Sequence, residues 1–75
     1  MKEFLLVLML CDDTACQTGS VYVVDSFVNP LPVSAWVDCN EQRKARKAQL
    51  IPASAKDERR LLCKTPEEMA KMGLY

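Results

Sequence analysis

Four cysteines, Cys11, Cys16, Cys39 and Cys63, are the residues of this 75-residue chain whose type and spacing point most directly to chemistry. They could form disulfides, remain buried free thiols or bind zinc. Zinc sites usually contain cysteines separated by about two to four residues, and only the first two approach that spacing. The pattern therefore favours two disulfides, which would staple a chain too short to build a large core. It predicts no metal site and no cofactor.

Catalysis by these cysteines would require a base or a cation that lowers the pKa of the thiol, and the chain contains no histidine. Cys63 precedes a lysine, but a strand cysteine that faces the core is the better interpretation. The paired acids at 12–13 and 67–68 are neighbours in sequence, whereas acid–base catalysis needs carboxylates that face each other across a substrate. They fit a turn and a helix start, so we expect a protein that is not an enzyme.

The first half of the chain contains two apolar segments that predict a β-hairpin. Residues 3–11 form a short run rich in Leu, Val and Phe, which indicates a strand buried on both faces. Residues 20–27 are β-branched and aromatic and form a second predicted strand. The polar loop between the strands ends at Gly19. Cys11 and Cys16 flank this loop, so we expect a disulfide at the neck of the hairpin.

The apolar run 4–11 also raises the question of a secretory signal or a membrane anchor. It has about eight residues, far below the roughly 18 to 20 that a membrane span requires. Glu3 cancels the positive charge that a signal places before its apolar core, and no small-residue cleavage site follows. We therefore expect a strand and no membrane partner. The missing signal indicates a reducing compartment, which conflicts with the disulfide prediction.

A helix is predicted over residues 34–49, after two prolines end the second strand. Ser34 is the expected N-cap and Asp38 the expected acid of the first turn, while basic residues gather near the C-terminus, as the helix dipole favours. Trp36 and Cys39 are the main apolar residues. The first half of the helix should therefore pack on the sheet, and the second half should be solvated.

Residues 59–64 predict a third strand, because they form a short segment that follows a loop with a proline break. A short helix comes next, and each part of its start is present. Thr65 is the expected cap, Pro66 occupies the first helical position, and two acids fill the first turn. Gly73 is expected to end this helix.

The order strand, strand, helix, strand, helix predicts one small α+β domain over residues 1–75. We expect a ββαβ(α) arrangement, with an antiparallel three-stranded sheet, one helix packed on a face and a short C-terminal helix. In this arrangement Cys39 on the helix could meet Cys63 on the third strand. A disulfide between them would lock the helix to the sheet.

Basic residues form the best candidate for a partner-binding site. Residues 1–42 contain one basic and six acidic residues, whereas the remainder contains nine basic and four acidic ones. The candidate residues are Arg43, Lys44, Arg46, Lys47, Arg59 and Arg60, with Trp36 either in the core or as a partly exposed anchor beside them. A solvated helix face without a function is the simplest alternative. This charge would steer the protein toward a partner protein with an acidic surface.

Nucleic acid is a second partner for the same basic residues, since several of them could contact phosphates at once. The tract contains no aromatic residue for base stacking, which weakens a single-strand interpretation. The net charge of zero also argues against a dedicated nucleic-acid binder. A protein partner is therefore the preferred interpretation.

Several short segments within residues 3–64 occur in an order that resembles a known class of proteins. They are the apolar start Phe4 to Leu10, the hairpin cysteines Cys11 and Cys16, Val23-Val24-Asp25-Ser26-Phe27, the helix with Cys39 and Glu41-Gln42-Arg43, and Leu61-Leu62-Cys63. The class consists of short uncharacterised proteins encoded in enterobacterial phages and prophages. This chain differs from it by the basic segment 43–60 and by the added terminal helix.

The resemblance implies a phage accessory protein in the cytoplasm of a bacterial host, with an exported or periplasmic location as the alternative. It supplies no catalytic residues. Combined with the basic tract, it leads us to expect a non-enzymatic protein that binds or inhibits a host protein. The exposed edge of a three-stranded sheet also allows a dimer.

Overall fold

The computed structural model describes residues 2–15, 19–55, 58–71 and 73 of the chain. Its elements, in chain order, are the strands β1 (Lys2–Cys11) and β2 (Gly19–Asn29), the helix α1 (Pro32–Leu50), the strand β3 (Glu58–Lys64) and the helix α2 (Pro66–Lys71). The three strands form one antiparallel sheet. This architecture confirms the predicted small α+β fold.

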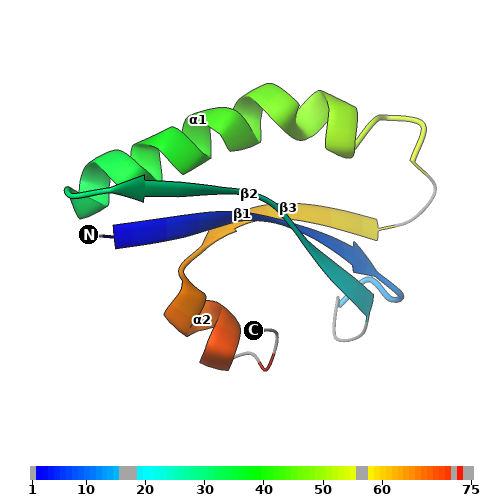
Figure 1. The fold of residues 1–75 in the computed structure, drawn as a ribbon. Coiled ribbons are helices and arrows are strands. Elements are labelled where there is room, and N and C mark those ends of the chain that lie inside the picture. The colour runs from blue at the N-terminus through cyan, green and yellow to red at the C-terminus, as the bar shows by residue number, and fades with distance from the viewer. Residues whose placement is uncertain (1, 16–18, 56–57, 72, 74–75) are drawn as a thin grey trace.

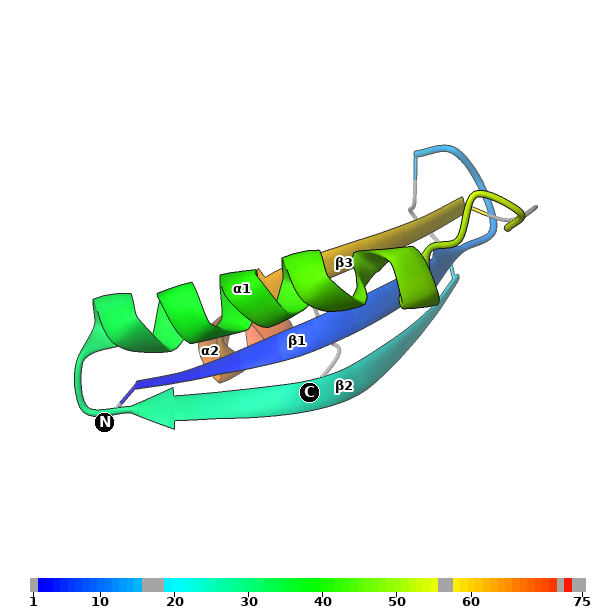
Figure 2. The same ribbon diagram turned by 90° about the horizontal axis from the view of Figure 1, so that it is seen from above.

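The sheet has the order β2-β1-β3, so the N-terminal strand lies in the centre and is antiparallel to both neighbours. The hairpin register pairs Lys2 with Asn29 at one end and Cys11 with Gly19 at the other. A β-bulge interrupts the pairing between Leu6 and Val7, where β2 carries one extra residue. Figure 1 shows α1 along one face of the sheet and α2 on the opposite face, and Figure 2 shows from above that α1 runs roughly along the direction of the strands.

Each face of β1 contributes to a separate core, because successive side chains of a strand point to opposite faces. On the α1 side, Leu6 is buried with residues of α1 and β3. On the α2 side, Leu5 and Val7 are buried with Met69 of α2. The prediction of a first strand buried on both faces is therefore confirmed. The C-terminal helix covers the face that α1 leaves open.

The start of α1 differs from the prediction. The helix begins at Pro32, and its N-cap is Leu31, which has φ −97° and ψ 120° and makes no side-chain cap hydrogen bond. Asn29 Oδ1 instead accepts a hydrogen bond from the Leu31 N–H at 3.0 Å. Proline suits the first helical position because its missing N–H has no intrahelical partner there. Ser34 as N-cap was therefore wrong, and Asp38 does not lie in the first turn.

The start of α2 confirms the predicted cap. Thr65 Oγ1 accepts a hydrogen bond from the Glu68 N–H at 3.1 Å, and Glu68 Oε1 accepts one from the Thr65 N–H at 3.3 Å. This reciprocal pair is a capping box, which satisfies two backbone donors that a helix start leaves open. Pro66 is the first helical residue, and Lys64 Nζ lies 3.6 Å from Glu68 Oε2. The Gly73 N–H donates to the Ala70 carbonyl oxygen, which closes the last turn.

A disulfide joins Cys39 on α1 to Cys63 on β3, as predicted. Their α-carbons lie 6.1 Å apart, inside the range of about 4.4 to 6.8 Å that the bond accepts. For these two cysteines the disulfide interpretation is correct, and the free-thiol and zinc interpretations are wrong. No cysteine in the described ranges is a free thiol. The predicted partner of Cys11, Cys16, lies outside the described residues, so the second crosslink stays a prediction.

The described ranges contain no helix that is both long enough and apolar enough to cross a membrane.

Candidate protein-binding surface on α1

The first two turns of α1 expose large apolar side chains. Val33, Trp36 and Val37 have exposed fractions of 73 %, 48 % and 37 %. Their spacing of three and four residues places them next to one another on the helix surface. The sheet is contacted instead by Ala35 and Cys39, which are completely buried. We call Val33, Trp36 and Val37 the apolar cluster.

Trp36 therefore does not lie in the core, and the interpretation of this residue as a core side chain is wrong. About half of its surface remains in contact with solvent. Leu31, directly before the helix, is also exposed, at 64 %. Exposed apolar residues that stand singly are ordinary, but a group of large ones at adjacent positions marks a surface suited to binding.

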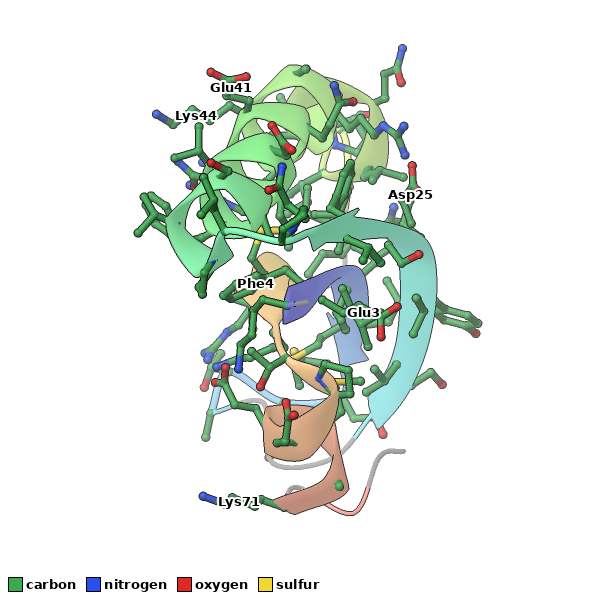
Figure 3. All side chains as sticks on the ribbon, turned by 60° about the vertical axis from the view of Figure 1, so that its left-hand side comes forward. Glu3, Phe4, Asp25, Glu41, Lys44 and Lys71 are labelled. Carbon is green, nitrogen blue, oxygen red and sulfur yellow. A yellow bond between two sulfur atoms is a disulfide. The ribbon has the colours of Figure 1, made fainter. Side chains whose placement is uncertain are left out.

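The next turn of the helix exposes the acids Asp38 and Glu41, and the turns after it are cationic. Lys44 and Lys47 are exposed, and neither side chain forms an ion pair or hydrogen bond in the described part of the chain. Arg43 is half-buried, and its Nε and Nη2 both donate to Asn40 Oδ1, at 3.1 and 2.9 Å. Figure 3 shows Lys44 and the neighbouring Glu41 pointing from α1 away from the sheet. We call Arg43, Lys44 and Lys47 the cationic turn.

Arg46 belongs to a different surface, although it lies within the same basic tract. Its Nη2 is 3.1 Å from Asp25 Oδ2 on β2, and the two side chains are 35 % and 41 % exposed. Figure 3 shows Asp25 on the edge of β2, on the side of the sheet that α1 covers. The ion pair occupies the guanidinium group and ties the second half of α1 to the sheet.

Arg59 and Arg60 are separated by the geometry of β3, because consecutive strand residues point to opposite faces. Arg59 Nη1 donates to the Leu50 carbonyl oxygen at 3.1 Å and so contacts the end of α1. Arg60 pairs with Met9, which packs on the α2-side core, and its Nη2 donates to the Thr14 carbonyl oxygen at 3.1 Å. The predicted basic residues therefore do not form one continuous surface.

The structure thus brings together four of the predicted site residues on α1: Trp36, Arg43, Lys44 and Lys47. It also adds two residues that the sequence analysis did not select, Val33 and Val37. Their spacing relative to Trp36 indicates that the three side chains share one face of the helix. The same spacing is equally consistent with a buried face. Only the burial of the small residues Ala35 and Cys39 shows which side of the helix faces the sheet.

The chemistry of this surface suits non-covalent binding. No three His, Cys, Asp or Glu side chains gather in the described ranges to hold a metal ion. Among the described residues, the carboxyl groups with a clearly shifted pKa are Glu67 and Glu68, which lie at the start of α2 on the other side of the sheet. For both, the pKa is lowered mainly by a backbone hydrogen bond, as expected for acids at a helix N-terminus.

Comparison of the chain with protein-family models, with curated proteins and with solved structures found no match. The fold and the surface of α1 therefore carry the functional argument alone.

Proposed function

We propose that this protein is a non-enzymatic interaction module that binds a partner protein through the outer surface of α1. The observation that carries the proposal is the arrangement along one exposed helix, where the apolar cluster is followed by the cationic turn. Desolvation of a partly exposed tryptophan contributes strongly to many protein interfaces. Exposed lysines about two to three turns further along the helix favour a partner whose surface is acidic beside an apolar centre.

The resemblance to phage and prophage proteins extends the proposal to the source of the partner. A phage-encoded accessory protein would act on a protein of the bacterial host. Inhibition would follow if the covered surface of the host protein were needed for its activity. The chemistry of the partner surface, apolar in the centre and acidic beside it, is the part of the proposal that α1 supports directly.

Partner capture from lysates of the bacterial host tests this proposal, with quantitative mass spectrometry as the readout. Immobilised protein is compared with Trp36→Ala and with a variant in which Lys44 and Lys47 are both replaced by Gln. We expect capture of the same host protein to be lost, or reduced at least about tenfold, in both variants. In the proposed interface Trp36 lies at the centre and the two lysines lie at the charged rim.

The matched control replaces Lys71 of α2 and Arg60 of β3 by Gln, which removes two positive charges away from the proposed surface. Capture should be unchanged in this control. Equal capture by all variants would remove α1 as the binding surface. Loss in the control alone would move the site to the α2 side.

A nucleic-acid partner fits this arrangement less well. Arg46 is engaged by Asp25, and Arg60 lies on the opposite face of the sheet, so the cations do not line one track for a phosphate backbone. Binding to DNA or RNA should therefore be weak at low salt. A gel shift that is tight at low salt and falls steeply as salt rises would favour nucleic acid instead.

A further inference from the structure

The first half of α1 contacts the sheet through small apolar side chains. The buried residues of this helix are Ala35 and Cys39, and both have small side chains. The larger apolar residues of its first half form the exposed apolar cluster. The α1-side core has Leu6 and Leu61 as its buried strand members beside Cys39, and Leu50 and Ile51 at the end of the helix also pack against it. The large apolar contacts of α1 therefore lie at its C-terminal end, whereas its first half meets the sheet through small side chains.

The polar contacts between α1 and the sheet lie in the second half of the helix. Arg46 forms its ion pair with Asp25, but both side chains are more than a third exposed, where ion pairs contribute little. Arg59 donates to the Leu50 carbonyl oxygen at the last helical residue. In the first half of α1, one turn after Trp36, the covalent bond from Cys39 to Cys63 is the principal anchor.

We propose that the Cys39–Cys63 disulfide is a redox-controlled latch: reduction by a dithiol releases the first half of α1 from the sheet and thereby disorders the apolar cluster of the partner-binding surface. The proposal concerns regulation of the surface assigned above and rests on that assignment for its functional consequence. The α2-side core, with Leu5, Val7 and Met69, contains no residue of α1. This core therefore keeps its packing when the first half of α1 opens, which makes local opening of that half the expected response.

The exchange begins at the more accessible sulfur. Cys63 is only partly buried and lies on the edge strand β3, whereas Cys39 is completely buried. A thiolate of the dithiol attacks Cys63 Sγ, the S–S bond breaks, and Cys39 leaves as a thiolate that takes up a proton. The second thiolate of the dithiol then displaces Cys63 Sγ and closes the disulfide of the reductant. The dithiol is oxidised by two electrons, and both cysteines end as thiols.

Hydrogen exchange with mass-spectrometric readout tests the latch without any partner. Oxidised protein is compared with protein reduced by dithiothreitol, both as the natural sequence and with Cys11 and Cys16 replaced by Ser, so that Cys39–Cys63 is the reducible bond. We expect amides of α1 to exchange at least about tenfold faster after reduction, with a clearly smaller change in β1. Unchanged exchange in α1, or an equal acceleration in α1 and β1, would overturn the proposal.

The Cys39→Ala/Cys63→Ala variant is the second arm. Its α1 amides should exchange rapidly with or without dithiothreitol, and protection equal to that of the oxidised protein would contradict the latch. Partner capture is then repeated on oxidised and reduced protein, and we expect at least about a tenfold loss on reduction. Equal capture in both states would overturn the regulatory role.

These results are separable from those of the proposed function. If Trp36→Ala leaves capture unchanged, the binding surface is wrong, while the exchange data still decide whether the disulfide holds α1.

Discussion

Leu6 and Val7 are neighbours in β1, yet their side chains lie in different cores. Leu6 is completely buried beneath α1, and Val7 is 1 % exposed beneath α2. The backbone between them also carries the irregularity in the pairing with β2. One strand thus supplies the centre of both layers, and the stability of the whole domain depends on it.

Truncation of either side chain should be costly. We expect Leu6→Ala to lower the free energy of unfolding by about 3 kcal/mol and Val7→Ala by about 2 kcal/mol, because each leaves a cavity in a closed core. Denaturant titration followed by circular dichroism measures both. Val28→Ala on β2 is the control, since Val28 is 54 % exposed and its truncation should cost less than about 0.5 kcal/mol. A cost of that small size at Leu6 would contradict the central role of β1.

The Arg46–Asp25 ion pair should contribute little to stability. Both side chains are more than a third exposed, so a double-mutant cycle of Arg46→Gln and Asp25→Asn should give a coupling energy below about 1 kcal/mol. The cycle of Arg43→Gln with Asp25→Asn provides the matched control, because Arg43 bonds to Asn40 instead. A coupling energy of several kcal/mol for the first cycle would show that this contact, and not the disulfide, holds α1.

The capping box at the start of α2 can be tested at Thr65. Thr65→Ala removes the acceptor for the Glu68 N–H and should lower the free energy of unfolding by about 1 kcal/mol. Thr65→Ser keeps the hydroxyl group and should retain most of that stability. Equal losses in the two variants would assign the effect to the buried methyl group of Thr65 rather than to the cap.

Stability should also depend on the protonation of Glu68. Its pKa is lowered from the usual 4.5, first of all because the Thr65 backbone N–H donates to the carboxylate. A lowered folded-state pKa means that this stabilisation is complete above pH 4.5 and is lost as the pH falls through the folded-state value. Urea titrations at a series of pH values below and above 4.5 should show this loss, and Glu68→Gln should reduce it. An identical pH profile in the variant would count against the assignment.

Gly19 should tolerate no side chain. Its φ is +150°, and a Cβ atom there would overlap the carbonyl oxygen of Leu10 on the paired strand. Gly19→Ala should therefore cost more than about 1 kcal/mol, since both the backbone conformation and the space oppose it. Gly73→Ala is the matched comparison: its φ is +73°, but among the described residues no atom outside the glycine and its chain neighbours lies within 4 Å of the added Cβ. Thermal unfolding should show the larger loss at Gly19.

The strands and α2 could be predicted from the sequence because their signals are local. A short apolar run fixes β1, and the spacing of Thr65 and Glu68 fixes the cap of α2. The start of α1 was missed because Pro32 serves two roles, as it ends the extended segment and occupies the first helical position.

The candidate surface could be predicted only in part. The lysines of α1 were identified by their charge. Which surface each arginine occupies depends on contacts across the fold, such as Arg46 with Asp25 and Arg60 with Thr14. The exposure of Trp36 follows from the orientation of α1, which small buried residues and a long-range disulfide determine. The periodicity of the sequence does not reveal which side of α1 faces the sheet, because α1 has no strong apolar stripe.

The central position of the N-terminal strand has a consequence for synthesis on the ribosome. β1 leaves the ribosome before both of its neighbours, and β3, whose Lys64 pairs with Leu5, follows only after β2 and α1. Until then one edge of an almost wholly apolar nascent segment has no partner strand. The slow closure of this long-range pairing should make the nascent chain a substrate for chaperones and should set the rate at which the finished protein folds.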